Sequence, residues 1–303
     1  MNRLHFLVIS SDQPFQDRLT KALGNDFSFT CVCEGEGVRH ALLERRPDAL
    51  LINPRERIPA DEDPLRIARG IYPGIPAALI TATDTSACFQ LLRTYGLGSA
   101  LPPNLGLPPY LLRYFLKHMA RPSSLLELDA FLDRSVTLTS ANVTASGERI
   151  ALFEQIRHDF AACPYVNIHD LQLVFEELLN NALFHAFRNE RNQPKYVGGK
   201  EQVIDVEDKI CLHWAAGEQF SVFSITDNQG LLERATVWDR FIRQTSLSGL
   251  LDTNGRGVYL THLLSNLMLA SVRPGKCTRI AVFFYPGSMR QPKPISVQMA
   301  LEE

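Results

Sequence analysis

The chain has 303 residues, of which 45% are hydrophobic and 21% are charged, with a formal net charge of −2. This composition excludes a mostly disordered chain, and the lack of excess basic charge argues against a protein that coats nucleic acid. No apolar run reaches the roughly 20 residues of a membrane span. We therefore expect a cytoplasmic protein of roughly two domains that binds neither membrane nor nucleic acid.

The first residues and the cysteines agree with that compartment. The opening stretch MNRLHFLVISSD predicts a buried strand, because its apolar part is too short for a signal peptide and no small-residue cleavage site follows. The six cysteines form no Cys-x-x-Cys pair. We expect them to be the reduced thiols of a cytosolic protein.

Residues 1–120 alternate short apolar runs with amphipathic segments. The apolar runs, which we predict to be strands, are Phe6–Ser10, Phe27–Cys33, Ala49–Asn53, Ala77–Thr81 and Ser99–Leu101. The segments predicted to be helices are about 14–23, 36–45, 64–71, 85–95 and 108–120. This alternation predicts a flavodoxin-like α/β fold, in which helices cover both faces of a doubly wound parallel sheet.

The carboxyl ends of these predicted strands carry Asp12, Asn53 and Thr81, and ligands of such sheets bind at that edge. The segment resembles the receiver domain of bacterial response regulators. That family binds Mg²⁺ with an acidic pair after its first strand and phosphorylates an aspartate that ends its third strand. It also has a serine or threonine at the end of the fourth strand and a lysine after the fifth.

The chain departs from that family at several of these positions. Only Asp12 remains of the acidic pair, Asn53 stands at the acceptor position, and Leu101-Pro102-Pro103 lacks the lysine. Thr81 matches the family. An amide cannot act as a carboxylate nucleophile, and one carboxylate is a poor Mg²⁺ site. We therefore expect a pseudo-receiver that is not phosphorylated. The alternative is that Asp12 or a nearby aspartate accepts phosphate.

Three other segments carry weaker patterns. Residues 121–134 are expected to be a linker, whose apolar part Leu125–Leu132 is either a short connecting helix or a dimer contact. Residues 189–209 are polar and glycine-rich, and we expect an exposed insertion that is mobile or contacts a partner. Residues 287–303 are expected to be a flexible tail.

The strongest helix signal of the chain lies at 168–188. Six apolar residues at helical spacing predict one stripe that faces a core; they are Leu171, Val174, Phe175, Leu178, Leu179 and Ala182. Glu177, Asn181 and His185 form a second stripe at four-residue spacing. A carboxylate, an amide and an imidazole on successive turns can face one cleft. The alternative is a solvated polar face.

Two further segments carry polar groups or glycines at the ends of elements. Phe220–Thr226 predicts a buried strand that ends in Asp227 and a turn with Gly230. The alternative to a ligand contact at Asp227 is an ordinary Asx turn. Gly255-Arg256-Gly257 precedes a helix whose apolar residues recur as far as Leu267. Glycines and a helix N-terminus favour phosphate binding, and the alternative is a plain turn before a helix.

The order of these pieces resembles the ATP-binding fold shared by histidine kinases, gyrase-type ATPases, a heat-shock chaperone and the anti-sigma factor kinases. The resemblance covers about 135–286. The helix motif Glu177-Leu-Leu-Asn180-Asn181-Ala182-Leu-Phe-His185-Ala186 is most similar to that of the bacterial anti-sigma factor serine kinases. The resemblance implies a GHKL-type α/β sandwich with helices on one face of a mixed sheet, with ATP and Mg²⁺ as cofactors.

Carried over by position, the helix stripe would supply the metal-binding and catalytic groups. Asn181 would bind Mg²⁺ between the ATP phosphates. Glu177 would be the general base that deprotonates a water or a substrate serine, a role typically worth about 10²–10⁴-fold in rate. His185 would be either a nucleotide-binding residue or a packing residue.

The adenine end of the implied site departs from the family. Asp227 would accept the adenine amino group. The family sequence Asp-x-Gly-x-Gly is replaced here by Asp227-Asn-Gln-Gly-Leu, so that Gly230 stands one place off. Bulk at Gln229 or Leu231 is expected to narrow the adenine pocket.

The phosphate end of the implied site would be formed by the main-chain amides of Gly255 and Gly257, with Arg256 between them. The segment from about 233 to 254 contains three more arginines that can reach phosphates; they are Arg234, Arg240 and Arg243. Of the four, we favour Arg256 for this role.

Two functions remain open from the sequence. The first is a serine kinase of the anti-sigma type, regulated by the pseudo-receiver, whose partner is a sigma factor, its antagonist or another signalling protein. The second is a non-catalytic adaptor that binds nucleotide weakly or not at all, which the altered positions Asn53 and Gln229 favour. A homodimer is compatible with both. A sensor histidine kinase is set aside, because His158 lies too close before Glu177 and suits that fold's first helix.

Overall fold

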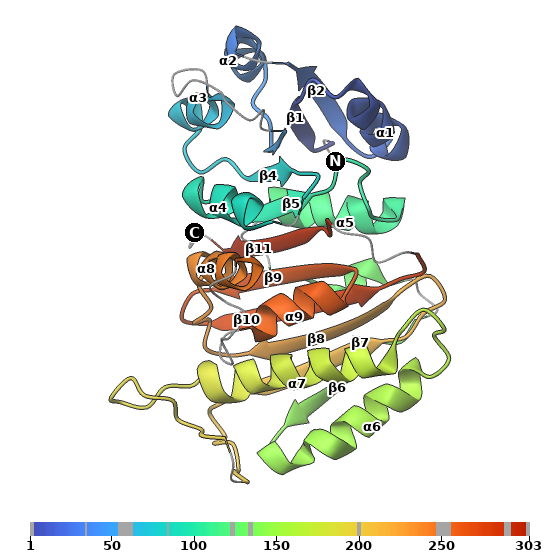
Figure 1. Cartoon of the computed structure of the whole chain (residues 1–303), viewed down its shortest axis with the longest axis vertical. Coiled ribbons are helices and arrows are strands. Elements are labelled where there is room, and N and C mark those ends of the chain that lie inside the picture. The colour runs from blue at the N-terminus through green and yellow to red at the C-terminus, as the bar shows by residue number, and fades with distance from the viewer. Residues whose placement is uncertain are drawn as a thin grey trace. The chain divides into compact units, whose positions relative to one another are not determined.

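The computed structural model describes residues 3–33, 35–53, 63–83, 85–121, 125–132, 136–198, 201–246, 256–287 and 292–300. The chain forms two compact units (Figure 1). The first unit comprises Met1–Pro122 and Gln291–Ser296, and the second comprises Ser123–Arg290 and Val297–Glu303. None of the helices in the described ranges is long and apolar enough to span a membrane.

The first unit is built on a parallel sheet. Its strands, in order across the sheet, are β2 (Ser28–Val32), β1 (His5–Ile9), β3 (Ala49–Ile52), β4 (Ala77–Ile80) and β5 (Ser99–Leu101). The helices that follow the strands are α1 (Gln13–Leu23), α2 (Gly35–Glu44), α3 (Pro64–Ile71), α4 (Ser86–Thr94) and α5 (Pro109–Ala120). The order 2-1-3-4-5 is the flavodoxin-like one, which confirms the fold predicted for this segment.

Burial explains why this unit is easy to recognise in the sequence. Every residue of β1, β3 and β4 is buried, because helices cover both faces of the sheet and the strands are therefore apolar at consecutive positions. Polar residues mark the helix starts. The side chain of Asp12 caps α1 and that of Asp63 caps α3 by accepting hydrogen bonds from main-chain amides.

The prediction of a flexible tail over 287–303 is wrong for its central part. Ile295–Met299 forms strand β11, and the side chains of Ile295 and Val297 are fully buried. Within the first unit, Ile295 and Ser296 pair antiparallel with β5, and the hydroxyl groups of Ser99 and Ser296 lie 2.9 Å apart. Apolar residues alternate along β11, as expected of a strand, but its pairing partner is almost 200 residues away.

The second unit is built on strands β9 (Leu267–Arg273), β10 (Cys277–Phe284), β8 (Ser221–Asp227), β7 (Ile210–Ala215) and β6 (Thr139–Val143), in that order. All pairs among these five strands are antiparallel. In Figure 1, helices α6 (Arg149–Phe160), α7 (Ile168–His185) and α9 (Gly257–Leu264) lie across the strands on the side that faces the viewer. The fourth helix of the unit is α8 (Arg234–Thr245).

Helix α7 packs its predicted apolar stripe into the core of this unit. All six residues of the stripe are buried, and the ring of Phe175 contacts Phe153 on α6 and Phe223 on β8, at centroid distances of 5.4 and 5.9 Å. The stripe of Glu177, Asn181 and His185 therefore lies to one side of the packed face. The helix ends at His185, three residues before its predicted end.

Helix α9 is shorter than predicted. It ends at Leu264, and Leu267, which fitted the helical spacing, begins β9 instead. Ser265 and Asn266 separate the two elements, and such residues favour helix ends and turns because their side chains bond to nearby main-chain groups. Here the Ser265 hydroxyl donates to the carbonyl of Thr261 at 2.8 Å, and Asn266 Oδ1 accepts from the main chain of Tyr285 at 3.1 Å.

The apolar part of the predicted linker belongs to the second unit. It contains a short 3₁₀ helix, η1 (Leu128–Phe131), so the prediction of a connecting helix is the one that the structure supports. Leu126 and Phe131 are buried. The amide of Leu126 donates to Ser271 Oγ at 3.2 Å, and the ring of Phe131 contacts Phe283. These side chains are buried inside the unit, so they are not available for a dimer contact.

The segment predicted as an exposed insertion is tied down where the structure describes it. Tyr196 is buried against Phe187, and its hydroxyl donates to Asp208 at 2.7 Å. Lys195 bonds to both Asp205 and Asp208. Residues 199 and 200 lie outside the described ranges. Most of the other described residues of 189–209 are exposed, which confirms the predicted exposure of this insertion.

Candidate functional site

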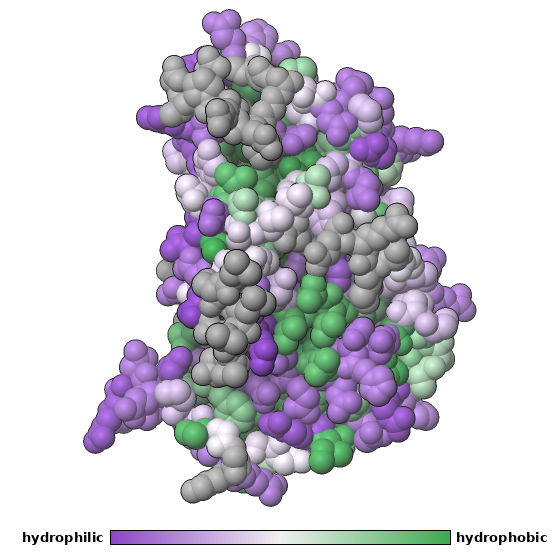
Figure 2. Space-filling view, viewed as in Figure 1, coloured by the Kyte–Doolittle hydropathy of each residue, from purple (hydrophilic) through white to green (hydrophobic). Residues whose placement is uncertain are grey.

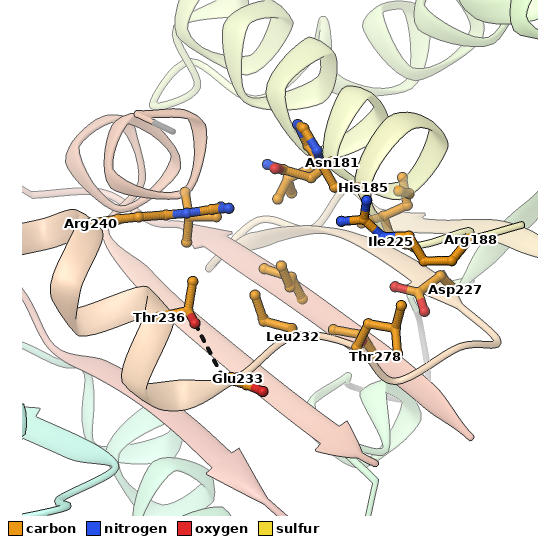
Figure 3. Close-up of a pocket in the computed structure, with 16 residues that line it drawn as sticks. Asn181, His185, Arg188, Ile225, Asp227, Leu232, Glu233, Thr236, Arg240 and Thr278 are labelled. Carbon is orange, nitrogen blue, oxygen red and sulfur yellow. Dashed lines mark hydrogen bonds between the residues drawn. The ribbon is translucent and has the colours of Figure 1, made fainter. Parts of the chain in front are cut away.

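The second unit contains a pocket of about 380 Å³, a size typical of small-ligand sites. Its walls come from α7, the end of β8, α8, α9 and β10 (Figure 3). The polar side chains that line it include Asn181, His185, Arg188, Asp227, Arg240 and Thr278. The pocket therefore gathers residues from segments that are far apart in the sequence.

Asp227 forms the buried end of the pocket. It ends β8, its side chain is only 8% exposed, and Thr278 pairs with it across the sheet on β10. Its Oδ1 accepts hydrogen bonds from the amides of Gln229 at 2.9 Å and Gly230 at 3.2 Å, which is an Asx turn. Burial raises the pKa of the Asp227 carboxyl, and the hydrogen bonds from these amides and from Thr278 oppose that shift. The turn amides therefore hold Oδ1 in place.

Asn181 presents an oriented acceptor to the same pocket. Its amide nitrogen donates to the carbonyl of Glu177 at 2.8 Å, which fixes the direction of the side chain. Its Oδ1 accepts no hydrogen bond within the described part of the chain. Figure 3 shows Asn181 and His185 projecting from α7 on one side of the pocket.

The start of α9 lies against the polar stripe of α7. A Cβ atom added to Gly257 would lie 2.4 Å from Glu177 Oε2 and 3.2 Å from Asn181 Nδ2, so only glycine allows this approach without displacing the carboxylate. Burial raises the pKa of Glu177, a shift that Arg256 opposes and Glu176 reinforces. Four predicted site residues, Glu177, Asn181, Arg256 and Gly257, therefore lie together.

The remaining predicted residues of this site have mixed outcomes. His185 lines the pocket, where partial burial and the charges of Arg240 and Arg188 lower its pKa. Gly230 does not line the pocket. It has φ of +66°, and a Cβ atom there would lie 2.1 Å from the carbonyl oxygen of Arg273, so its role in this structure is to let the turn approach β9. Gly255 lies outside the described residues.

Of the two bulky residues predicted to narrow the adenine pocket, only one lies in the pocket wall. Leu231 lines the pocket and is 46% exposed, whereas Gln229 does not line it. The cavity beside Leu231 nevertheless keeps its volume of about 380 Å³. The replaced glycine therefore changes one wall and does not close the pocket.

Several pocket residues were not identified from the sequence, Arg188 and Thr278 among them, and Arg240 was not the favoured arginine. Arg188 lies three residues beyond His185 and would have appeared had the polar stripe been continued by one turn. Thr278 carries no local signal, because only the pairing of β10 with β8 brings it beside Asp227.

The candidate site of the first unit is satisfied by its own residues. Asp12 Oδ1 accepts from the amide of Phe15 at 2.9 Å as the cap of α1. Asn53 Nδ2 donates to Ser10 Oγ at 3.4 Å, and the amide of Asp12 donates to the same oxygen at 3.1 Å. Thr81 bonds locally to Thr83. Within the described ranges, no three His, Cys, Asp or Glu side chains gather closely enough to hold a metal ion.

Restoring the carboxylate alone is not expected to restore phosphorylation. We expect Asn53→Asp to incorporate no more phosphate from labelled acetyl phosphate and Mg²⁺ than the wild type, because Asp12 is engaged as a helix cap and remains a single metal-binding carboxylate. A second variant, Ser11→Asp with Asn53→Asp, rebuilds the acidic pair as a comparison. Phosphate uptake by Asn53→Asp alone would show that the remaining residues still form a working acceptor site.

Comparisons with known proteins concern only part of the chain. No protein-family model and no curated protein matches the sequence. Among solved structures, a protein described as a response regulator from Chloroflexus aurantiacus is 17% identical, with a TM-score of 0.33, and the match covers 39% of this chain and 98% of that one. The beryllofluoride-activated receiver domain of nitrogen regulatory protein C is 25% identical in two solution structures. These matches cover 34% of this chain and 83% of each domain, with TM-scores of 0.28 and 0.27. The flavodoxin-like description of the first unit rests on its strand order.

Proposed function

We propose that the second unit binds ATP with Mg²⁺ and that the protein is a signalling regulator. The observation that carries the proposal is the convergence of separately predicted residues. Asn181 and Asp227 line one pocket, and a Cβ atom added to Gly257 would lie 3.2 Å from Asn181 Nδ2. A solvated helix face, an Asx turn and a plain turn before a helix would each explain one segment. None of these alternatives requires the three segments to meet.

The chemistry of the pocket fits such a ligand. Asp227 offers a buried carboxylate oxygen to an exocyclic amine, and the oxygen of Asn181 is a ligand type that Mg²⁺ accepts. Mg²⁺ is commonly held by one or two protein oxygens together with substrate phosphates, which agrees with the lack of a carboxylate cluster in the described ranges. Gly257 begins α9 beside Asn181, and a helix N-terminus favours a phosphate.

As a finer proposal, the unit is a protein serine kinase of the anti-sigma type. Bound ATP would supply the phosphoryl group. Glu177 would accept the proton of the attacking serine hydroxyl. The raised pKa of Glu177 lies closer to the range in which a general base works near neutral pH. The partner would be a sigma factor, its antagonist or another signalling protein. Figure 2 shows an apolar area over α9 and the neighbouring part of α7, which supports a protein partner.

A second candidate is a non-catalytic adaptor that binds nucleotide weakly. Leu231 favours it, because this side chain stands in the pocket wall where the resembling family has glycine. In both cases we propose that the first unit regulates the second through protein contact, without phosphorylation. The engaged side chains of Asp12 and Asn53 support that view.

The nucleotide proposal is tested by calorimetric titration with ATP and Mg²⁺. We expect the wild type to bind, and Asn181→Ala to lose about 10- to 100-fold in affinity for the magnesium complex, as when a hydrogen-bonding or charged contact is removed. Asn180→Ala is the matched control, because Asn180 lies on the same helix outside the pocket and contacts Arg149.

The outcomes separate the two candidates. No heat and no thermal stabilisation of the wild type at millimolar ATP and Mg²⁺ would remove the nucleotide proposal. Equal binding by the wild type and Asn181→Ala would remove the role of Asn181. Binding without transfer of labelled phosphate to co-purified proteins would favour the adaptor over the kinase.

A further inference from the structure

Two guanidinium groups converge on one spot in the pocket. Arg240 projects from α8, and Arg188 follows the end of α7. Figure 3 shows them reaching in from opposite sides, with their charged ends directed toward each other below Asn181 and His185. Both cations lower the pKa of the His185 imidazole, which is independent evidence that they lie close to the same group.

No acidic side chain in the described part of the chain pairs with either guanidinium. The two carboxylates that line the pocket are occupied or exposed elsewhere, since Asp227 accepts from the turn amides and exposed Glu233 accepts from Thr236 Oγ1 at 3.4 Å. Arg240 is half-buried, and burial lowers its pKa. A partly buried cation without a counter-ion is unfavourable, and the exposed guanidinium of Arg188 directed toward it adds repulsion. The arrangement therefore favours an anion between them.

The pocket has chemically different ends. Figure 3 shows Asp227 with Thr278 on one side and Arg240 on the opposite side. A phosphate would be repelled by the buried carboxylate and attracted to the guanidinium groups, whose planar forks match phosphate oxygens. An uncharged ring that carries an amine would instead be favoured beside the Asp227 carboxylate. The two ends thus favour one orientation of a ligand that has both parts.

Resting on the proposed function, we propose that Arg188 and Arg240 form a clamp that binds the phosphate part of the nucleotide and makes the pocket selective for phosphorylated ligands over the nucleoside. Of the four arginines that the sequence offered for phosphate, Arg240 is the one that lines the pocket, whereas Arg234 and Arg243 do not. Arg256 lies beside Glu177 instead. The clamp therefore combines Arg240, which the sequence analysis placed behind Arg256, with Arg188, which it did not single out.

The test compares ATP with magnesium, AMP and adenosine in titrations of the full chain. We expect Arg240→Gln and Arg188→Gln each to lose about 10- to 100-fold in affinity for ATP, the range for a charge-assisted hydrogen bond, with adenosine affinity unchanged. Arg240→Lys keeps the positive charge but loses the planar guanidinium group that can bond to two phosphate oxygens. Its affinity for ATP should fall between those of the wild type and Arg240→Gln. Arg243→Gln is the matched control on the same helix and should bind like the wild type.

Ligand-free unfolding supplies a second readout. Removing an unpaired, half-buried cation should leave Arg240→Gln as stable as the wild type or more stable, whereas a purely structural arginine would give a loss. Failure of the wild type to bind either ATP or adenosine would defeat the proposed function itself. A wild type that binds ATP, with both glutamine variants binding equally well, would overturn the clamp alone. Equal losses for ATP and adenosine, or a destabilised Arg240→Gln, would also overturn it.

Discussion

Asp227→Asn is expected to weaken ATP binding by about 10- to 100-fold, the effect of leaving buried polar groups mismatched, while leaving the fold at least as stable as the wild type. Asparagine keeps an Oδ1 that can accept from the amides of Gln229 and Gly230. Its second polar group is an NH₂ donor, which would face the amine donor of an adenine ring. Titration calorimetry and urea unfolding at neutral pH measure the two effects.

The stability part of this prediction follows from the sign of the pKa shift. Burial raises the pKa of Asp227 in the folded protein, so the contribution of this group is most favourable at low pH and is lost as the pH rises through the folded value. The neutral asparagine does not titrate. The variant's advantage in unfolding free energy should therefore be small near pH 4 and grow toward pH 8.

A charge control and a contrary outcome complete this experiment. Asp170→Asn, in the first turn of α7 and outside the pocket, should bind ATP like the wild type. An Asp227→Asn protein that binds ATP with unchanged affinity would mean that this carboxylate does not contact the ligand. A large loss of stability at neutral pH would mean that its ionised form is structurally required.

Gly230→Ala is expected to destabilise the second unit by about 2–4 kcal/mol. One part of this loss is the cost of the left-handed conformation for alanine, and the other is the steric overlap of the new Cβ atom with the main chain. The Gly230 φ is +66°, and the new Cβ would lie 2.1 Å from the Arg273 carbonyl oxygen and 2.9 Å from the Cys277 nitrogen. Neither neighbour is a flexible side chain, so the turn between β9 and β10 would have to move.

Gly275→Ala is the matched control for this substitution. Gly275 has nearly the same φ of +68°, but no atom lies within 4 Å of its added Cβ. It should lose only the conformational part, about 1–2 kcal/mol. Urea unfolding of both variants measures the difference. Equal losses at the two positions would contradict the close approach at Gly230.

The first unit was predictable because its signals are local. Each buried strand is a continuous apolar run such as Ala49–Ile52, and turns with proline or glycine separate the elements. Strand β11 was missed for the opposite reason. Its partner is β5, which lies far away in the sequence. The apolar alternation of β11 extends over only five residues, which is too short to identify a strand when its partner is far away in the sequence.

The site was predictable to the extent that one element or one turn defines it. Helical spacing identified Asn181 and His185, and the end of a strand identified Asp227. Arg188 and Arg240 face each other only because α8 packs where it does, and Thr278 depends on the register of β10 with β8. The helix through Leu267 was over-extended because its apolar spacing also fits a strand that begins after Asn266.

The most direct test of this account is a crystal structure of the full chain with a non-hydrolysable ATP analogue and Mg²⁺. We predict the base against Asp227, the phosphates between Arg188 and Arg240, and the metal on the oxygen of Asn181. An analogue bound at another place, or a pocket without it at saturating concentration, would contradict the account.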